Sequence, residues 1–392
     1  MSTNLAQLIG GPCLIQYAGS TFRSKADVKL ELTLETYDIV TDLYGLVDKR
    51  VSGQPMKISF IPEGRFADLA VLFPYLSAPL GSLITPVYTV GAVDTAGDTI
   101  AVAQTSLAAG TPVSFGTTGT MIGGLTAATL YYLGADAAGV RHVHLTAAAA
   151  IAGTGAIDLT TAGTGTIKFV IQQALVIIGN DGQRVTFYNA AVTKMPTING
   201  ASLKTLWDGG VEFEAFPKNG IPWATANSFF TIDTAAFADA GFNDSDLITQ
   251  PYQGSWGNAP WDTFYTKTGF VISNTLSLEP VEDDASGVLT RRISGLSFTA
   301  KAQPLGPDLP ALVAALTLQG AGAVRGRSLA GSNLNITATG VYMRLYAAAL
   351  VGGPAQWATK LDRIGELTWQ ATRTFTGGAP NPLFYIGSVA PS

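Results

Sequence analysis

The sequence is poor in charge and nearly free of cysteine. Lys, Arg, Asp and Glu make up only 13% of its 392 residues, which is about half of the usual share. Cys13 is the single cysteine, which excludes an intramolecular disulfide framework and a multi-cysteine zinc site. A freely exposed surface with so few charges would associate readily. We therefore favour extensive burial between subunits over the alternative of a large core alone.

A basic surface and a membrane-spanning run are also missing. The net charge of −5 argues against a protein that grips nucleic acid through phosphates, although not against one that lets it pass. The uncharged run 69–93 is interrupted by three prolines and falls short of a helix of about 20 residues. Residues 1–14 lack the pattern of a signal peptide. We expect no membrane partner.

Catalytic motifs are absent as well. His142 and His144 are the only histidines, and two ligands make a poor zinc site unless an acid such as Asp136 or Asp158 completes it. Both histidines lie in a segment of low charge, so they offer no nucleophilic triad. The glycines at 163 and 165 lack the lysine of a phosphate-binding loop. The sequence predicts a protein that is not an enzyme and that uses no metal or cofactor.

Several blocks of sequence recur in the same order, which indicates an internal duplication. Residues 50–53 (RVSG) return as 292–295 (RISG) at an offset of 242, while 32–35 (LTLE) match 276–279 (LSLE) at 244. The remaining matches are Pro62 with Pro304 and Gly64 with Gly306 at 242; Gly182 with Gly340 and 187–191 with 345–349 at 158; and Gly209, Val211, Phe213 and Ala215 with Gly365, Leu367, Trp369 and Ala371 at 156.

The fall in offset from 242 to 158 places an insertion of 84 residues in the first copy. The segment at about 83–165 is rich in Gly, Ala and Thr, with short β-prone runs between glycine clusters. This pattern is typical of a small all-β module inserted in a surface loop, where insertions are tolerated best.

Alternating apolar residues predict a strand with one buried face near the start of each copy. In the first copy, Val28, Leu30, Leu32 and Leu34 alternate with Lys29, Glu31, Thr33 and Glu35. In the second, Ile272, Asn274, Leu276 and Leu278 alternate with Ser273, Thr275, Ser277 and Glu279. A short helix follows in each copy, at 66–73 before Pro74 and at 309–316 after a capping Asp308.

Residues 17–75, YAGSTFRSKADVKLELTLETYDIVTDLYGLVDKRVSGQPMKISFIPEGRFADLAVLFPY, resemble the major tail proteins, or tail tube proteins, of long-tailed bacteriophages. The resemblance lies in an early strand pair with a long loop and in the turn G-x-x-x-x-x-x-F-x-P-x-G before one short helix. Residues 110–159 resemble small β-modules of phage structural proteins. The resemblance covers most of 11–216 and, through the repeat, extends to 262–377.

The resemblance and the repeat together predict a mainly β (α+β) fold with two tandem β-sandwich domains, each with one short helix. The first tube domain would comprise 1–84 and 166–221, the insertion domain 85–165, projecting outward, and the second tube domain 222–392.

In this family, strands of neighbouring subunits join in a ring around a channel for DNA. The expected function is therefore a structural protein of the virion tail, assembled in the bacterial cytoplasm. Two domains per chain would give a homotrimeric ring with pseudo-sixfold symmetry. Expected partners are further copies of the chain, the tape measure, tail tip and terminator proteins, and DNA in transit without specific binding.

The same resemblance assigns roles to two sets of residues. The segments 36–49 and 280–291 would be long loops that stack one ring on the next, and their acidic residues are Asp38, Asp42, Asp48, Glu282, Asp283 and Asp284. A solvated loop is the alternative. The polar strand faces would line the lumen, through Lys29, Glu31, Thr33, Glu35, Ser273, Thr275, Ser277 and Glu279. Without net positive charge, such a lumen would let DNA slide. Alternatively, Lys29 pairs with an acid across a strand.

Two other functions stay open. One is a different phage structural protein, such as a capsid decoration or baseplate hub protein. The other is a carbohydrate-binding adhesin, suggested by the β-rich insertion and by Trp256, Trp261 and Tyr265. Packing of these aromatic residues on a neighbouring subunit is the commoner meaning.

Overall fold

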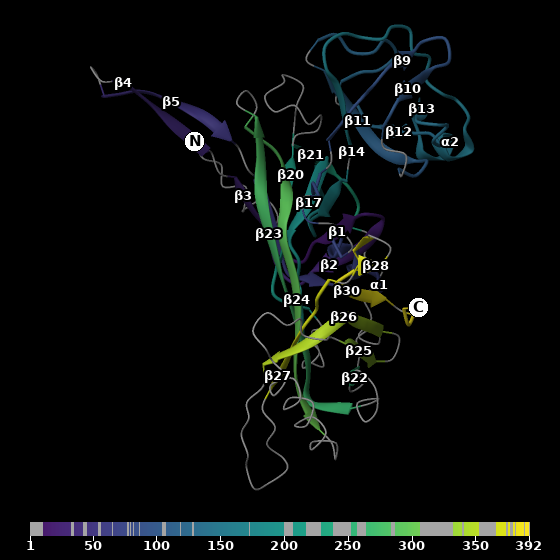
Figure 1. The fold of residues 1–392 in the computed structure, drawn as a ribbon. Coiled ribbons are helices and arrows are strands. Elements are labelled where there is room, and N and C mark those ends of the chain that lie inside the picture. The colour runs from purple at the N-terminus through teal and green to yellow at the C-terminus, as the bar shows by residue number, and fades with distance from the viewer. Residues whose placement is uncertain are drawn as a thin grey trace.

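The computed structural model of the chain is mainly β, which confirms the predicted fold class. Strands dominate the described part of the molecule, and its helices are short (Figure 1). The structure describes residues 11–32, 35–41, 45–53, 56–64, 66–76, 78, 80, 82–85, 87–103, 107–117, 119–127, 129–171, 173–199, 207–216, 229–237, 252–256, 264–283, 287–305, 332–338, 341–352, 366–373, 375–376, 379–380, 382–387 and 389–391.

The first unit, residues 11–85 and 173–237, contains two antiparallel sheets. The larger sheet consists of β21 (Phe230–Thr234), β16 (Gln183–Phe187), β15 (Leu175–Ile178), β1 (Leu14–Tyr17), β2 (Ser20–Ser24) and β7 (Pro62–Glu63). The smaller sheet consists of β17 (Asn189–Lys194), β20 (Val211–Phe216), β6 (Met56–Phe60) and β3 (Lys29–Leu32). Tyr17 and Phe213 meet edge to face between the sheets, with ring centroids 4.8 Å apart. The sheets therefore form a sandwich with one core.

Two further elements complete the first unit. A hairpin of β4 (Glu35–Thr41) and β5 (Gly45–Gly53) extends beyond the sandwich and projects from the body of the molecule (Figure 1). The predicted helix is present as α1 (Phe66–Leu69) followed by the 3-10 turn η2 (Ala70–Leu72). Its apolar side chains join the core, because Leu69 and Leu72 are fully buried.

The inserted module, residues 87–171, has its own sheet and its own core. The strands, in spatial order, are β8 (Val87–Thr89), β14 (Ile167–Ile171), β11 (Thr111–Thr117), β12 (Tyr131–Leu133), β13 (Val140–His144), β10 (Thr99–Ala101) and β9 (Val93–Asp94). Phe115 and Phe169 are fully buried in a core cluster separate from that of the two units. Helix α2 (Ala147–Ala152) was not predicted from the sequence; its N-cap Thr146 accepts a hydrogen bond from the Ala149 amide.

The second unit, residues 252–391, is built around a long hairpin. Its strands are β22 (Gln253–Trp256), β23 (Phe264–Asp283), β24 (Gly287–Leu305), β25 (Ser332–Ala338), β26 (Val341–Gly352), β27 (Leu367–Gln370), β28 (Phe375–Thr376), β29 (Ala379–Pro380) and β30 (Phe384–Gly387). β23 and β24 run along much of the molecule in Figure 1. The pairings return on themselves, from β23 through β22, β25, β26 and β27 to β24. The helix predicted at 309–316 lies outside the described residues.

The hairpins of the two units have the same register. Adding 242 to both residue numbers of any described pair between β3 and β6, or between β4 and β5, gives an observed pair between β23 and β24. For example, Lys29 lies opposite Ser59, and Val271 lies opposite Lys301. Both bulges recur, with Ser52 and Val47 skipped in the first unit and Ser294 and Leu289 in the second. A bulge fixes the register of a pair. Glu35 therefore corresponds to Ser277, which corrects the sequence match at an offset of 244.

The remaining strand pairs correspond as well. β17 with β20 matches β26 with β27 at offsets of 158 and 156, including a bulge after Val192 and after Leu350. The other matching pairs are β1 and β15 with β22 and β25, β15 and β16 with β25 and β26, β16 and β21 with β26 and β30, and β6 and β20 with β24 and β27. In these pairs β16 corresponds to β26 at the sequence offset of 158 and β20 to β27 at 156, whereas β15 corresponds to β25 at 159.

The cores correspond down to single contacts. Trp256 and Trp369 occupy the positions of Tyr17 and Phe213 and also meet edge to face, with centroids 6.3 Å apart. The Tyr17 hydroxyl donates to the Ala190 carbonyl at 3.5 Å, and Trp256 Nε1 donates to the carbonyl of the corresponding Ala348 at 2.8 Å. The polar tip of a buried aromatic residue thus finds the same acceptor in both units.

The sheets differ from the predicted boundaries at two places. β14 begins beyond residue 165 and pairs with β8 and β11, so this strand belongs to the inserted module. β21 lies beyond residue 221 but pairs with β16, as β30 pairs with β26. The sequence matches between the two copies do not extend into β21. The sequence alone therefore did not indicate that this strand belongs to the first unit.

Candidate assembly surfaces

A joint between the two units is formed first by strand pairing. β18 (Thr197–Asn199) of the first unit pairs with β23 of the second, with Ile198 opposite Ile272 and Asn199 opposite Val271. Ile198 and Ile272 are both buried. On its other side, β18 pairs with β19 (Trp207–Asp208). Because β23 also pairs with β24, the sheet is continuous from the first unit into the second.

A second contact of the joint runs along the other strand of the long hairpin. Residues 82–85 of the first unit lie beside β24, where the Ile84 amide donates to the Arg291 carbonyl at 3.0 Å. The Ile293 amide donates to the Ser82 carbonyl at 2.9 Å. The side chains of Thr85 and Thr290 are hydrogen-bonded at 2.6 Å, and both residues are buried. This short segment therefore supplies ladder-like bonds across the joint.

An ion pair completes the joint. Arg291 on β24 donates to the Glu214 carboxylate on β20 through two nitrogens, Nε to Oε2 and Nη2 to Oε1 at 3.0 Å. The Glu214 side chain is only 4% exposed and that of Arg291 20%. A bidentate contact between arginine and carboxylate fixes the orientation of the two side chains as well as their distance. These two residues were not identified from the sequence, because their pairing depends on how the two units meet.

The candidate lumen residues of the first unit lie on β3 and at the start of β4. Lys29 and Glu31 are exposed and form an ion pair along the strand, not across strands as the alternative supposed. The Lys29 ammonium lowers the pKa of the Glu31 carboxyl by hydrogen bonding and charge attraction. Glu35 begins β4, while Thr33 lies outside the described residues. The expected burial of Leu32 was wrong, since this residue is 48% exposed.

On β23 the predicted alternation is present. Ile272 is buried and Asn274 is half-buried, whereas Thr275, Ser277 and Glu279 are exposed. Ser273 is half-buried. Glu279 pairs with Arg292 across the hairpin at 2.9 Å. The polar face of β23 therefore presents mostly neutral hydroxyl groups to its surroundings.

The candidate stacking segments are paired strands along most of their length, so the prediction of long loops was wrong. Asp38 lies exposed in β4, and Asp48 lies in β5. Glu282 and Asp283 are the last two residues of β23. Asp42 and Asp284 lie outside the described residues. Tyr, Ile, Val and Thr in 36–41 favour strand formation, and this preference prevails over the single acidic residue among them, Asp38.

Groups with possible chemistry are engaged in the fold. The Nδ1 atoms of His142 and His144 lie 3.0 and 2.9 Å from the carbonyl oxygens of Asp98 and Thr154. Burial raises the pKa of the Cys13 thiol to about 11. Within the described part of the chain, no three His, Cys, Asp or Glu side chains gather as a metal site, and no helix is long and apolar enough to cross a membrane.

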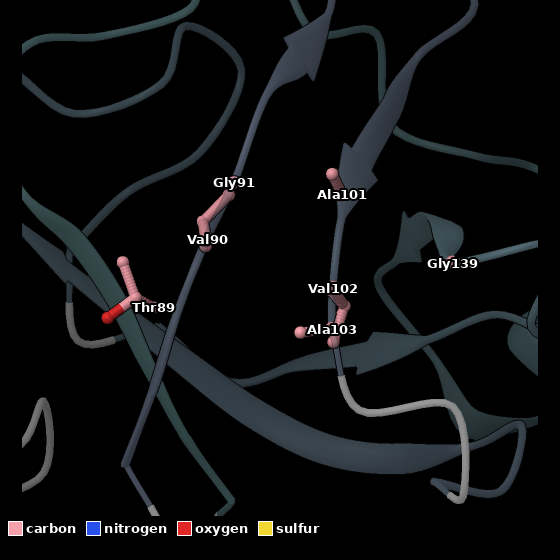
Figure 2. Close-up of a pocket in the computed structure, with 7 residues that line it drawn as sticks. All are labelled: Thr89, Val90, Gly91, Ala101, Val102, Ala103 and Gly139. Atoms are coloured by element: carbon pink, nitrogen blue, oxygen red, sulfur yellow. The ribbon is translucent and has the colours of Figure 1, made fainter.

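A pocket of about 440 Å³ lies in the inserted module, between the ends of β8 and β10 (Figure 2). It is lined by Thr89, Val90, Gly91, Ala101, Val102, Ala103 and Gly139. Most of these residues are small and apolar, and the Gly91 amide donates to the Ala101 carbonyl while the Val102 amide donates to that of Gly139. Among these described lining residues there is no charged side chain and no histidine or cysteine, and Thr89 supplies the one side-chain hydroxyl.

The aromatic residues considered for carbohydrate binding do not form one surface. Trp256 is buried against Trp369 in the core of the second unit. Tyr265 is 48% exposed, and Trp261 lies outside the described residues. The sequence matches no known protein family and no curated protein.

Proposed function

We propose that this chain is the structural subunit of a phage-type tail tube, with two equivalent units that form adjacent segments of one ring. The observation that carries the proposal is the common register of the two units, in which strand pairs and three bulges of the first recur in the second. A tube subunit with two such units would replace two single-unit subunits.

The form of the joint supports this proposal. The first unit contributes residues 82–85, β18 and Glu214, whereas the second unit contributes the edges of its long hairpin. The two contacting surfaces are different, so the contact is head to tail. Repetition of a head-to-tail contact gives a closed ring or a helical filament. Three chains in a ring would present six units.

The charge distribution is compatible with passage of DNA. On β23 the exposed positions Thr275 and Ser277 are neutral, and on β3 Lys29 is paired with Glu31. A surface of this composition would not hold phosphates by a net positive potential. As a tail tube, the protein would contact tape measure, tail tip and terminator proteins in the virion, and it would carry no catalytic activity.

Electron microscopy and mass measurement of the purified chain test the proposal. We expect rings or stacked tubes with a central channel and pseudo-sixfold projection symmetry. An isolated ring of three 40.7-kDa chains would have a mass of about 122 kDa. Six chains per ring would contradict the arrangement of two units per chain, and compact particles without a channel would favour a capsid decoration or hub protein instead.

A further inference from the structure

In the described part of the chain, the edge of β3 is open where the corresponding edge of β23 is covered. Among the described residues, β3 pairs with one strand, β6. The corresponding part of β23 pairs with β24 on one side and with β18 on the other. At the offset of 242 fixed by the hairpin registers, Lys29 and Leu30 take the places of Val271 and Ile272, which receive β18.

The exposure of side chains follows this difference. Ile272 is 1% exposed, whereas Leu30 is only partly buried. Leu32 corresponds to Asn274, whose side-chain amide donates to the Pro196 carbonyl at 2.9 Å, just before β18. Leu32 itself is 48% exposed. An open strand edge with an exposed leucine readily accepts another strand, and the second unit illustrates how such a strand is received.

The offset between the two units identifies the residues that correspond to β18 in the second unit. The offset of 158 that relates β17 to β26 takes Pro196 to Pro354 and the strand to residues 355–357. Proline thus precedes the strand position in both copies, and residues 354–357 follow closely after the end of β26 at Gly352. They lie outside the described residues.

We propose that the open edge of β3 is the docking surface for a second copy of this chain, which inserts its residues 355–357 in the register that β18 takes on β23. The inference rests on the proposed ring and specifies its contact between chains. A second part of the contact follows from the same correspondence, because Gln370 and Lys49 take the places of Glu214 and Arg291. The joint between chains would then repeat the joint within a chain.

Substitution of Leu32 tests the docking surface in the full-length protein. Leu32→Asp places a charge at the contact, and we expect the ring of about 122 kDa to be lost to single chains in native mass spectrometry. Leu32→Asn reproduces Asn274 and is expected to retain the ring. Leu145→Asp is the matched control, because Leu145 is 66% exposed in the inserted module. Circular dichroism and thermal unfolding of the single chains check that each variant folds.

Complementation of two blocked variants identifies the occupant. One variant is Leu32→Asp, and the other has residues 354–357 replaced by an equally long Gly-Ser linker. Each alone is expected to be a single chain, and their mixture is expected to form a dimer of two 40.7-kDa chains, about 81 kDa. Such a dimer requires one intact edge and one intact segment from different chains.

The outcomes separate this inference from the proposed function. Rings of folded Leu32→Asp protein, or rings of the linker variant, would overturn the β3 contact while leaving the tube proposal in place. Single chains of both variants that do not combine would also overturn it, since the segment would then bind elsewhere or within its own chain. If the unaltered chain forms neither rings nor tubes, the proposed function itself fails.

Discussion

Glu214 of the first unit and Arg291 of the second form a buried ion pair that ties the two units together. The pair lies beside the bonds of residues 82–85 to β24, so the joint combines backbone ladders with one strongly oriented side-chain contact. Burial makes such a contact sensitive to the loss of either partner, because the remaining charge is left without compensation.

Glu214→Ala is expected to destabilise the protein by about 3 kcal/mol, since it leaves Arg291 facing a poorly solvated site. Glu212→Ala is the matched control on the same strand. Glu212 pairs with Lys194 at 3.1 Å, with both side chains well exposed, and the loss there should stay below about 1 kcal/mol. Chemical denaturation of both variants measures the difference. Equal losses would show that the Glu214 pair contributes nothing through burial.

Trp369→Ala is expected to cost about 3 to 5 kcal/mol, because the side chain is fully buried between Trp256 and Phe264 and its removal leaves a cavity. Tyr265→Ala removes an aromatic side chain of which about half is exposed, 48%. We expect a much smaller change for this control, about 1 kcal/mol or less. Thermal and denaturant unfolding provide the comparison, and a small loss for Trp369→Ala would argue against a tightly packed second core.

The Cys13 thiol makes the stability depend on alkaline pH. Burial raises its folded-state pKa to about 11 from an ordinary value of 9.0. Between these values the unfolded chain loses a proton that the folded chain retains, so stability falls as the pH rises from about 9 to about 11. The contribution is about 1 to 3 kcal/mol.

Cys13→Ala is therefore expected to lose less stability than the unaltered protein over this pH range. Burial also raises the pKa of Tyr17 and of Tyr252, so the variant keeps some pH dependence of the same sign. Denaturation curves at pH 8, 9 and 10 for both proteins isolate the thiol. Parallel pH profiles would contradict the assignment.

The inserted module is expected to fold by itself. Its core cluster is separate from that of the two units, and its first and last strands are neighbours, with Val87 opposite Val170. Residues 87–171 expressed alone should show a cooperative thermal transition. The chain with this segment replaced by a short Gly-Ser linker should keep the transition of the remaining units. A module that unfolds when isolated would show that its stability depends on the rest of the chain.

The sequence predicted the β class, because alternation and turn glycines are local signals. It predicted much of the correspondence between the units, because similar blocks recur in the same order. The sequence match at an offset of 244 aligned the first strands of the two units two residues away from their observed correspondence at 242. Alternation alone cannot detect this error, because a shift of two residues leaves every side chain on the same face. The bulges at Ser52 and Ser294 and the register of β3 with β6 resolve that ambiguity. Helix α2 had readable signals that were missed, namely a capping threonine, a run of alanines and Gly153.

The assembly surfaces were harder to predict. Polar residues of the strand faces were identified by their alternation, and the structure places several of them on the exposed faces of β3 and β23. The joint could not be found in this way. Glu214 and Arg291 lie 77 residues apart and meet only through the arrangement of two folded units. The short strand β18 has no long alternating pattern to distinguish it from a loop.

The pairing of β18 with β23 also has a kinetic consequence. Because both strands belong to one polypeptide, this contact forms within one molecule, at an effective concentration set by the connecting chain and independent of the protein concentration. Half of the contacts in a six-unit ring would be established before any two molecules meet. Closure of the ring would then require the encounter of three bodies instead of six, and early assembly would be less sensitive to dilution.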